Sequence, residues 1–206
     1  DKLLPARAKV AKVRHHPAMP YADLGAFMQV LRGAESVSAR ALEFTILTAA
    51  RTGEVIGAKW GEIDFAAKVW TIPGDRMKAG REHRVPLCER AIEILEAMPR
   101  EGDGTGFIFP GARKGKGLSN MAMLELLRGM DATEGLTVHG FRSTFRDWAG
   151  ERTNFPREIA EAALAHVLSD KTEAAYRRGD FEEAITYYRR AAEGYRETET
   201  APVALY

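Results

Sequence analysis

The sequence is poor in several features, and each shortage excludes a class of protein. Its single cysteine, Cys88, cannot form an internal disulfide, and no Cys/His cluster has the spacing of a zinc site. No apolar run approaches the roughly 18 residues needed to cross a bilayer, and the charged N-terminal segment contains no apolar stretch of a secretory signal. We therefore expect a protein with no membrane contact that works in a reducing compartment, the cytoplasm.

The sequence also lacks a large excess of positive or negative charge. Thirty Lys and Arg residues face 29 Asp and Glu residues in a chain of 206, and the formal charge of +1 does not by itself indicate a nucleic-acid partner. Residues 1–20 hold five basic residues and one acidic residue, whereas residues 179–206 hold three basic and six acidic ones. Charge alone favours an ordinary solvated surface. The hydrophobic share of 45% is ample for a folded core.

The hydrophobic pattern predicts a mainly helical α+β protein. Apolar residues recur at helical spacing in most of the chain, whereas residues 63–72 and 84–87 alternate between apolar and polar. The alternation predicts a small antiparallel sheet whose hairpin, residues 73–83, is exposed, mobile and cationic. The expected helices cover residues 21–32, 38–51, 89–98, 119–130, 138–153, 156–166 and 169–179.

The polar residues that stand out have ordinary explanations when each is taken alone. Arg51 and Glu54 have the spacing of a helical ion pair, and His139 and Arg142 share one helix face. His166 suits a helix end, where a cationic imidazole is favoured. The order and spacing of the whole set carry more information. In chain order, the set is Arg51, Lys78, His139, Arg142, His166 and Tyr176.

This set, with the sequence around it, resembles the catalytic domain of the tyrosine recombinases, also called phage integrases. The resemblance is greatest to the prophage and genomic-island integrase subgroup, and it runs from about His15 to Arg178. The segments that carry it are LTAARTGEVIGAKWGEID, MKAGREHRVPL, VHGFRSTFRDWA and LAHVLSDKTEAAYRR. The usual Thr-Gly before the first arginine is replaced by Thr48-Ala49-Ala50, which leaves Arg51 in place.

DNA strand cleavage without a metal explains why these side chains occur together. The reaction needs a nucleophile, charge stabilisation on a pentavalent phosphorane and an acid for the departing 5′ oxygen. Tyr176 is the candidate nucleophile, and because a phenol has a reference pKa near 10, nearby cations must favour its anion. Arg51 and Arg142 provide planar sets of donors that suit the nonbridging phosphate oxygens.

The resemblance assigns roles to the remaining residues. It implies that His139 accepts the phenolic proton, that His166 donates to a nonbridging oxygen, and that Lys78 protonates the 5′ oxygen. Glu54 would orient Arg51 or its helix without touching DNA. The product would be a 3′-phosphotyrosyl bond and a free 5′ hydroxyl. Bond energy is conserved, so we expect no metal, ATP or other cofactor.

The resemblance also implies partners and domain boundaries. We expect double-stranded DNA attachment sites, a homotetramer on DNA, an isolated chain that is either monomeric or assembled, accessory excision or bending proteins, and a bacterial or phage-infected cell. Residues 1–20 would be a linker, residues 21–178 the catalytic domain, and residues 179–206 a terminal helix and tail that docks in cis or in trans. The chain begins at Asp1 without a methionine, so we expect it to be a piece of a longer protein. The resemblance implies core-binding and arm-binding domains upstream, without which DNA binding would be weak and salt-sensitive.

Two other interpretations stay open at the level of sequence. A type IB topoisomerase would use the same chemistry but reseal the original strand, and a noncatalytic helical interaction module would fit the near-neutral charge. Six further residues lie in predicted loops, where phosphate contacts and an ordinary solvated surface are equally compatible with the sequence. These candidate DNA contacts are Arg76, Arg81, His83, Arg113, Lys114 and Lys116.

Overall fold

The computed structural model describes residues 17–100, 105–131, 133–154 and 156–166. Tyr176, the helix expected over residues 169–179 and the acidic tail lie outside the described residues. No helix among the described residues is long and apolar enough to span a membrane.

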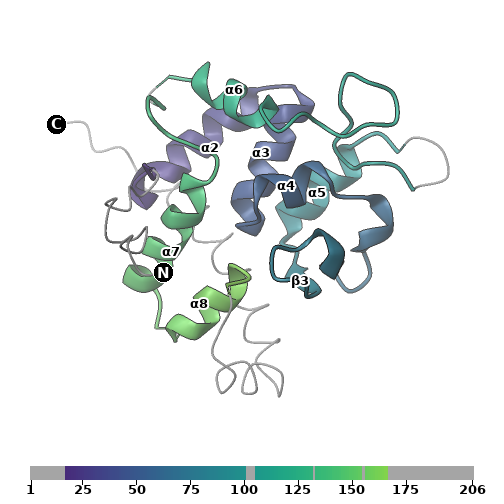
Figure 1. The fold of residues 1–206 in the computed structure, drawn as a ribbon. Helices are drawn as coiled ribbons and strands as arrows, with labels where there is room; N and C mark the ends of the chain where they lie inside the picture. Colours follow the sequence, from purple (N-terminus) through teal and green to yellow (C-terminus); the bar gives the residue numbers. More distant parts are fainter. Residues whose placement is uncertain (1–16, 101–104, 132, 155, 167–206) are drawn as a thin grey trace, which may run out of the picture.

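Helices make up about half of the described residues and outnumber the strands, as the hydrophobic spacing predicts. Figure 1 shows α7 and α8 on one side of the molecule and the sheet with α5 on the other, with α3 and α4 between them. The helices are α2 (Leu24–Gly33), α3 (Val37–Thr48), α4 (Thr52–Ile56), α5 (Glu89–Ala97), α6 (Ala122–Arg128), α7 (Gly140–Arg152) and α8 (Arg157–Ala163). Three short 3-10 helices are η1 (Tyr21–Asp23), η2 (Trp60–Glu62) and η3 (Gly74–Arg76).

The central helix is α3, which contacts α2, α4, α5 and α6. Its sequence places apolar residues on every side, and a helix of this kind is stable only where other elements surround it. The side chain of Ser36 begins the helix by accepting a hydrogen bond from the Ala39 N–H at 3.1 Å. Phe44 on α3 packs against Trp70 and Phe109, with ring centroids 5.4 and 5.5 Å apart. These contacts join the central helix to the sheet.

The small antiparallel sheet is confirmed, with three strands in the order β1-β2-β3. Strand β1 (Ile63–Asp64) pairs with β2 (Val69–Ile72), and β2 pairs with β3 (His83–Pro86). The register places Trp70 opposite Val85 and Ile72 opposite His83. The connection from β2 to β3 is the predicted cationic hairpin, and His83 is the first residue of its returning strand.

Several helix boundaries differ from the sequence prediction, most clearly at the end of α3. The helix expected to continue to Arg51 ends at Thr48, because Ala49 adopts a left-handed conformation with φ of 48°. A new single-turn helix, α4, then begins with Arg51 as its N-cap. Helix α6 is shorter than the predicted 119–130. Before α7, whose N-cap is His139, the Thr137 Oγ1 accepts a hydrogen bond from the Gly140 N–H at 3.1 Å.

Residues 17–20 lie against the first turns of α7. The Thr144 hydroxyl donates to the Met19 carbonyl at 2.7 Å, and Met19 is buried. A Cβ on Gly140 would lie 2.2 Å from the Pro17 carbonyl oxygen, so only glycine allows this close approach. The segment that leads into the domain is therefore packed onto the helix that carries His139 and Arg142.

Candidate active site

Arg51 is held by its own short helix. Its backbone N–H donates to Glu54 Oε2 at 2.7 Å, and its Nη1 donates to Glu54 Oε1 at 2.7 Å. Glu54 is buried, and it both caps α4 and fixes the direction of the guanidinium group. This geometry matches the orienting role that the sequence suggests for Glu54.

Arg142 is buried on α7, with 5% of the residue exposed. Its Nη1 donates to the Ala49 carbonyl, directly before α4, and its Nη2 donates to the Leu164 carbonyl at 2.6 Å. Arg51 Nη2 lies 3.4 Å from the carbonyl oxygens of both Leu164 and Ala165. Because both guanidinium groups reach the Leu164 carbonyl, residues far apart in the sequence lie side by side.

The C-terminal end of α8 provides these carbonyl acceptors. Ala165 has a φ of 48°, its N–H donates to the Ala162 carbonyl at 2.8 Å, and the His166 N–H donates to the Glu161 carbonyl at 2.9 Å. This is the Schellman arrangement of a helix end, with alanine in the left-handed position that glycine usually occupies. The last carbonyls of a helix lack intrahelical partners and carry partial negative charge, so they favour the two arginines.

His166 follows directly after this turn and lies beside Arg142. Its Nε2 is 3.4 Å from Arg142 Nη2, and its Nδ1 contacts Glu161 Oε2. Burial opposes ionisation of Glu161, but the hydrogen bond with His166 and the nearby charge of Arg146 hold the pKa of Glu161 below its ordinary value. A carboxylate on Nδ1 fixes the orientation of the imidazole ring and leaves Nε2 beside the guanidinium group of Arg142.

His83 also belongs to this cluster, which sequence reasoning missed. It lies at the start of β3, is half-buried, and makes a hydrogen bond with the backbone of Ala163. Burial lowers its pKa, the charges of Arg142 and Arg51 lower it further, and Glu54 opposes them. The exposed loop position expected for His83 is therefore wrong. The available signal was its place directly before the alternating residues 84–87, because β3 begins one residue earlier than that run.

Arg76 is the second loop candidate with a different environment from the expected one. It forms an ion pair with Glu62 and donates to the Glu54 carbonyl, and its side chain is 20% exposed. Its guanidinium group is therefore engaged in holding α4 and η2 rather than extended into solvent. Arg81, Arg113, Lys114 and Lys116 are exposed, as expected.

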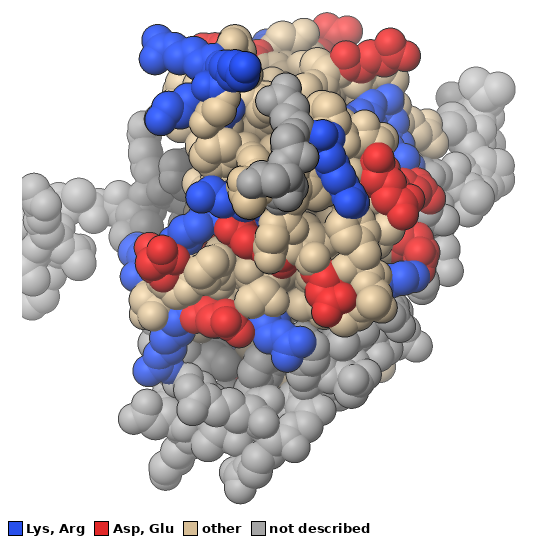
Figure 2. All heavy atoms as spheres, turned by 90° about the vertical axis from the view of Figure 1, so that its right-hand side faces the viewer, with Lys and Arg blue, Asp and Glu red and all other residues tan. Residues whose placement is uncertain are grey.

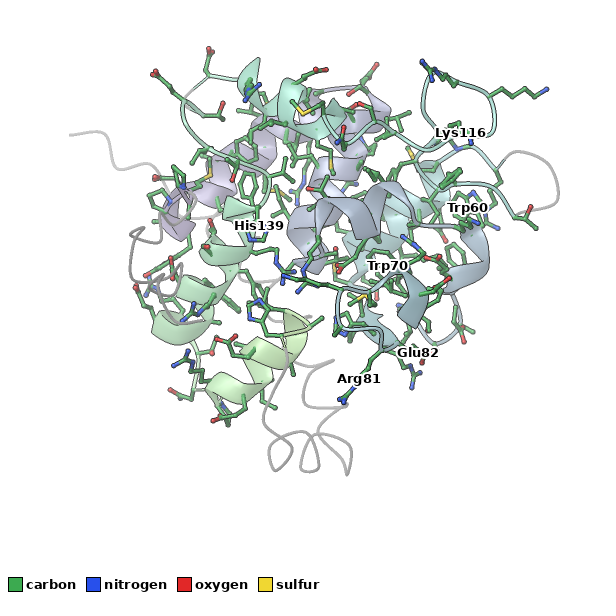
Figure 3. The ribbon with its side chains drawn as sticks, in the orientation of Figure 1. Trp60, Trp70, Arg81, Glu82, Lys116 and His139 are labelled. Carbon is green, nitrogen blue, oxygen red and sulfur yellow. The ribbon has the colours of Figure 1, made fainter. Side chains whose placement is uncertain are left out.

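The other predicted catalytic residues are Lys78, His139 and Tyr176. Lys78 is exposed near the tip of the hairpin, and His139 is exposed at the N-cap of α7, three residues before Arg142. Figure 3 shows His139 at the end of α7 that lies toward α3 and α4 in this view, and Arg81 pointing away from the hairpin. Tyr176 lies outside the described residues, so its position relative to the arginines stays a prediction.

Surface charge is mixed on the side of the molecule that carries the sheet and α5. Figure 2 shows Lys and Arg side chains interspersed with Asp and Glu on the face that it presents. Among the described residues, no group of three His, Cys, Asp or Glu side chains is arranged to hold a metal ion. The fold and the site together define a mainly helical domain that presents two arginines and a histidine at one helix end.

Comparison with known proteins gives the domain its family. The phage integrase family matches residues 19–183. Prophage integrase IntA of Escherichia coli K12 is 36% identical over 171 residues, which cover 82% of this chain and 41% of that protein. Prophage integrase IntZ of the same strain is 34% identical over 160 residues, which cover 77% of this chain and 40% of that protein.

Solved structures give the same fold. The integrase from mycobacterium phage Brujita aligns with a TM-score of 0.62 at 19% identity, covering 87% of this chain and 60% of that one. The Tn1549 transposon integrase in complex with transposon right end DNA aligns with a TM-score of 0.58 at 14% identity, covering 88% and 68%. This chain belongs to the phage integrase family, and it spans about two fifths of the length of the curated relatives it matches.

Proposed function

We propose that the protein is a site-specific DNA recombinase that cleaves and rejoins strands through a 3′-phosphotyrosyl intermediate, in the integration or excision of a prophage or genomic island. The observation that carries the proposal is the meeting of Arg51, Arg142 and His166 at the end of α8. Two guanidinium groups and an imidazole at one point form a site for a phosphate diester and its developing charge. Membership of the phage integrase family supports that chemistry.

In the proposed cleavage step, the phenol oxygen of Tyr176 forms a bond to phosphorus. The phenolic proton passes to His139, and the bond from phosphorus to the 5′ oxygen breaks. Lys78 gives a proton to that oxygen, so the products are a 3′-phosphotyrosyl bond and a 5′ hydroxyl. The 5′ hydroxyl of a partner strand reverses these steps and rejoins the backbone.

Arg51 suits this step because one of its two terminal nitrogens is only weakly engaged before DNA binds. Arg51 Nη1 is committed to Glu54, whereas Arg51 Nη2 makes only long contacts of 3.4 Å with carbonyl oxygens. A phosphate oxygen with full negative charge would compete well for that Nη2 group. His166 Nε2, beside Arg142, would donate to a second nonbridging oxygen.

The partners that we propose follow from the same family relationship. The substrate is double-stranded DNA containing attachment sites, and the active assembly is a homotetramer that carries out two successive strand exchanges with accessory proteins. The Tn1549 integrase, with the same fold, was solved in complex with DNA, which supports DNA as the ligand. The exposed Arg81, Arg113, Lys114 and Lys116 would contact phosphates and make binding depend on salt.

A covalent adduct tests the function directly. The chain would be incubated, with excess EDTA, with a library of nicked duplexes whose central base pairs are randomised, at a concentration where anisotropy shows that DNA is bound. We expect denaturation-resistant protein–DNA adducts whose sequencing identifies preferred sites. Tyr176→Phe should abolish the adduct, and Tyr188→Phe, a matched loss of another phenol, should not.

The same assay contains the outcomes that would contradict the proposal. Bound DNA without any adduct would reject the enzyme and leave a noncatalytic module. An adduct that persists in Tyr176→Phe would assign the nucleophile to another residue. Resealing without transfer of a strand to a second duplex would identify a topoisomerase instead of a recombinase.

A further inference from the structure

The hairpin that carries Lys78 is attached to the rest of the domain on both of its arms. On the outgoing arm, Arg76 contacts Glu62 and the Glu54 carbonyl, and Met77 is buried in the main hydrophobic core. Residues 78–82 are exposed, and the tip is compact because the Gly80 N–H donates to the Met77 carbonyl at 3.0 Å. On the returning arm, the first residue, His83, contacts α8.

The contact made by His83 differs from ordinary packing because it is polar and reaches α8. Its hydrogen-bonding partner, the backbone of Ala163, immediately precedes Leu164 and Ala165, whose carbonyls receive Arg142 and Arg51. The end of α8 is therefore contacted by groups from three elements, namely α4, α7 and β3. His83 is the one that comes from the hairpin.

We propose that His83 is a positioning residue that ties the Lys78 hairpin to the end of α8, and so fixes the general acid relative to the two arginines and His166. The inference rests on the proposed function, in which Lys78 protonates the departing 5′ oxygen. His83 itself does not transfer a proton to DNA. It acts through the hairpin, and only the steps that need Lys78 should depend on it.

Burial favours the neutral ring of His83 and is the main reason that its pKa is lowered. Arg51 from α4 and Arg142 from α7 also disfavour a positive imidazole, whereas Glu54 from α4 and the hydrogen bond with the Ala163 backbone favour one. A neutral imidazole has one N–H, which is sufficient for the bond to the Ala163 backbone. Near neutral pH, the tether would therefore operate without adding a third positive charge.

Replacement of the leaving oxygen by sulfur separates this role from a general structural one. A 5′-bridging phosphorothiolate leaves as a thiolate, which needs no acid, so cleavage of the sulfur substrate should not depend on Lys78. The variants are His83→Phe, which lacks a donor, and His83→Asn and His83→Gln, whose amides donate at about the reach of the two ring nitrogens. Glu82→Asp, an exposed neighbour, is the matched control, and Lys78→Ala is the benchmark for loss of the acid.

We expect His83→Phe to cleave the oxygen substrate about 10 to 100-fold more slowly than the parent, since a well-placed general acid contributes roughly 10² to 10⁴. On the sulfur substrate, the loss should be under about threefold, as for Lys78→Ala. His83→Asn or His83→Gln should restore the oxygen reaction, and Glu82→Asp should match the parent. Equal losses on both substrates, or no loss, would overturn the inference.

Hydrogen exchange gives a second readout that needs no cleavage. In DNA-free protein, His83→Phe should accelerate amide exchange in residues 77–83 by about tenfold relative to Glu82→Asp, with an unchanged urea midpoint for global unfolding. Unaltered exchange in the hairpin would overturn the tether. A parent chain that binds DNA but cleaves neither substrate would contradict the proposed function instead, and the exchange result would still decide whether His83 holds the hairpin.

Discussion

At the scale of single residues, the two arginines of the site differ in how they are supported. Arg51 is partly exposed and has a carboxylate partner, Glu54, whereas Arg142 is buried, donates to the Ala49 and Leu164 carbonyls and lies beside His166. Both should stabilise the same transition state, but Arg142 makes short hydrogen bonds to carbonyl groups, whereas Arg51 makes only long contacts of 3.4 Å with them. Activity and stability should therefore respond differently to the two substitutions.

Replacement of each arginine by alanine tests that difference. We expect both Arg51→Ala and Arg142→Ala to lower the cleavage rate by about 10² to 10³, by analogy with loss of an oxyanion donor. Arg142→Ala should also reduce the free energy of unfolding by about 1–3 kcal/mol, because the Ala49 and Leu164 carbonyls lose their donor. The measurements are single-turnover cleavage and urea unfolding.

The control is Arg128→Ala, which removes an exposed arginine from α6 and should change neither quantity appreciably. A folded Arg51→Ala or Arg142→Ala variant that cleaves at the parental rate would remove that arginine from the phosphate site. An unchanged stability of Arg142→Ala would show that the two carbonyls find other donors.

At the scale of elements, the helices and sheet could be predicted from the sequence, but the turns that build the site could not. Periodicity identifies the regular elements. The apolar spacing of residues 24–33 and 89–97 fits only a helix, and the alternation before Leu87 fits only a strand. Ala49 and Ala165 both adopt left-handed backbone, which is unusual for alanine, and the sequence gives no glycine to indicate it.

The candidate site could likewise be predicted from the sequence only in part. Arg51, Glu54, Arg142 and His166 come together as the motifs of the family suggest. The burial of His83 and the internal partners of Arg76 depend on which face of the hairpin meets α4 and α8. That information is tertiary, and short charged loops carry no periodicity from which to infer it.

The left-handed turn after α8 gives a prediction at this scale. Ala165→Gly should raise the free energy of unfolding by about 0.5 kcal/mol, because relief of left-handed strain, about 1–2 kcal/mol, exceeds the entropic cost of glycine in the unfolded chain, about 0.4–1 kcal/mol. Ala26→Gly, within α2, should lower it by about 1 kcal/mol. Urea unfolding measures both, and a loss of stability in Ala165→Gly would show that its methyl group contributes more by packing than its backbone conformation costs.

At the scale of the whole molecule, one buried carboxylate joins three helices. Glu43 on α3 has a fully buried side chain and bonds Arg32 of α2 at 2.9 Å, Arg40 of α3 at 2.7 Å and Arg90 of α5 at 2.8 Å. Arg40 also donates to the Arg32 and Ala34 carbonyls at 2.7 and 2.8 Å. This cluster lies at the ends of the helices that surround the core, and it fixes their relative positions.

Loss of the Glu43 charge should therefore destabilise the entire domain. Because the arginines are 16–25% exposed and can partly rehydrate, we expect Glu43→Gln to lower the free energy of unfolding by about 2–3 kcal/mol, below the full penalty for breaking a buried pair. Glu93→Gln removes the 53% exposed partner of Arg90 and should cost under about 0.5 kcal/mol. Urea unfolding at pH 7 measures both effects.

The pH dependence gives the sharper form of this prediction. Burial alone would raise the pKa of Glu43, but hydrogen bonds and charges from Arg90 and Arg32 lower it below 4.5 in the folded protein. A carboxylate with a lowered folded-state pKa stabilises the protein above its unfolded pKa, and that contribution is lost as the pH falls through the folded value. The stability difference between parent and Glu43→Gln should therefore be constant from pH 6 to 8 and should shrink as the pH falls below about 4.5. A difference that grows on acidification would mean that burial, and not the arginines, dominates the ionisation of Glu43.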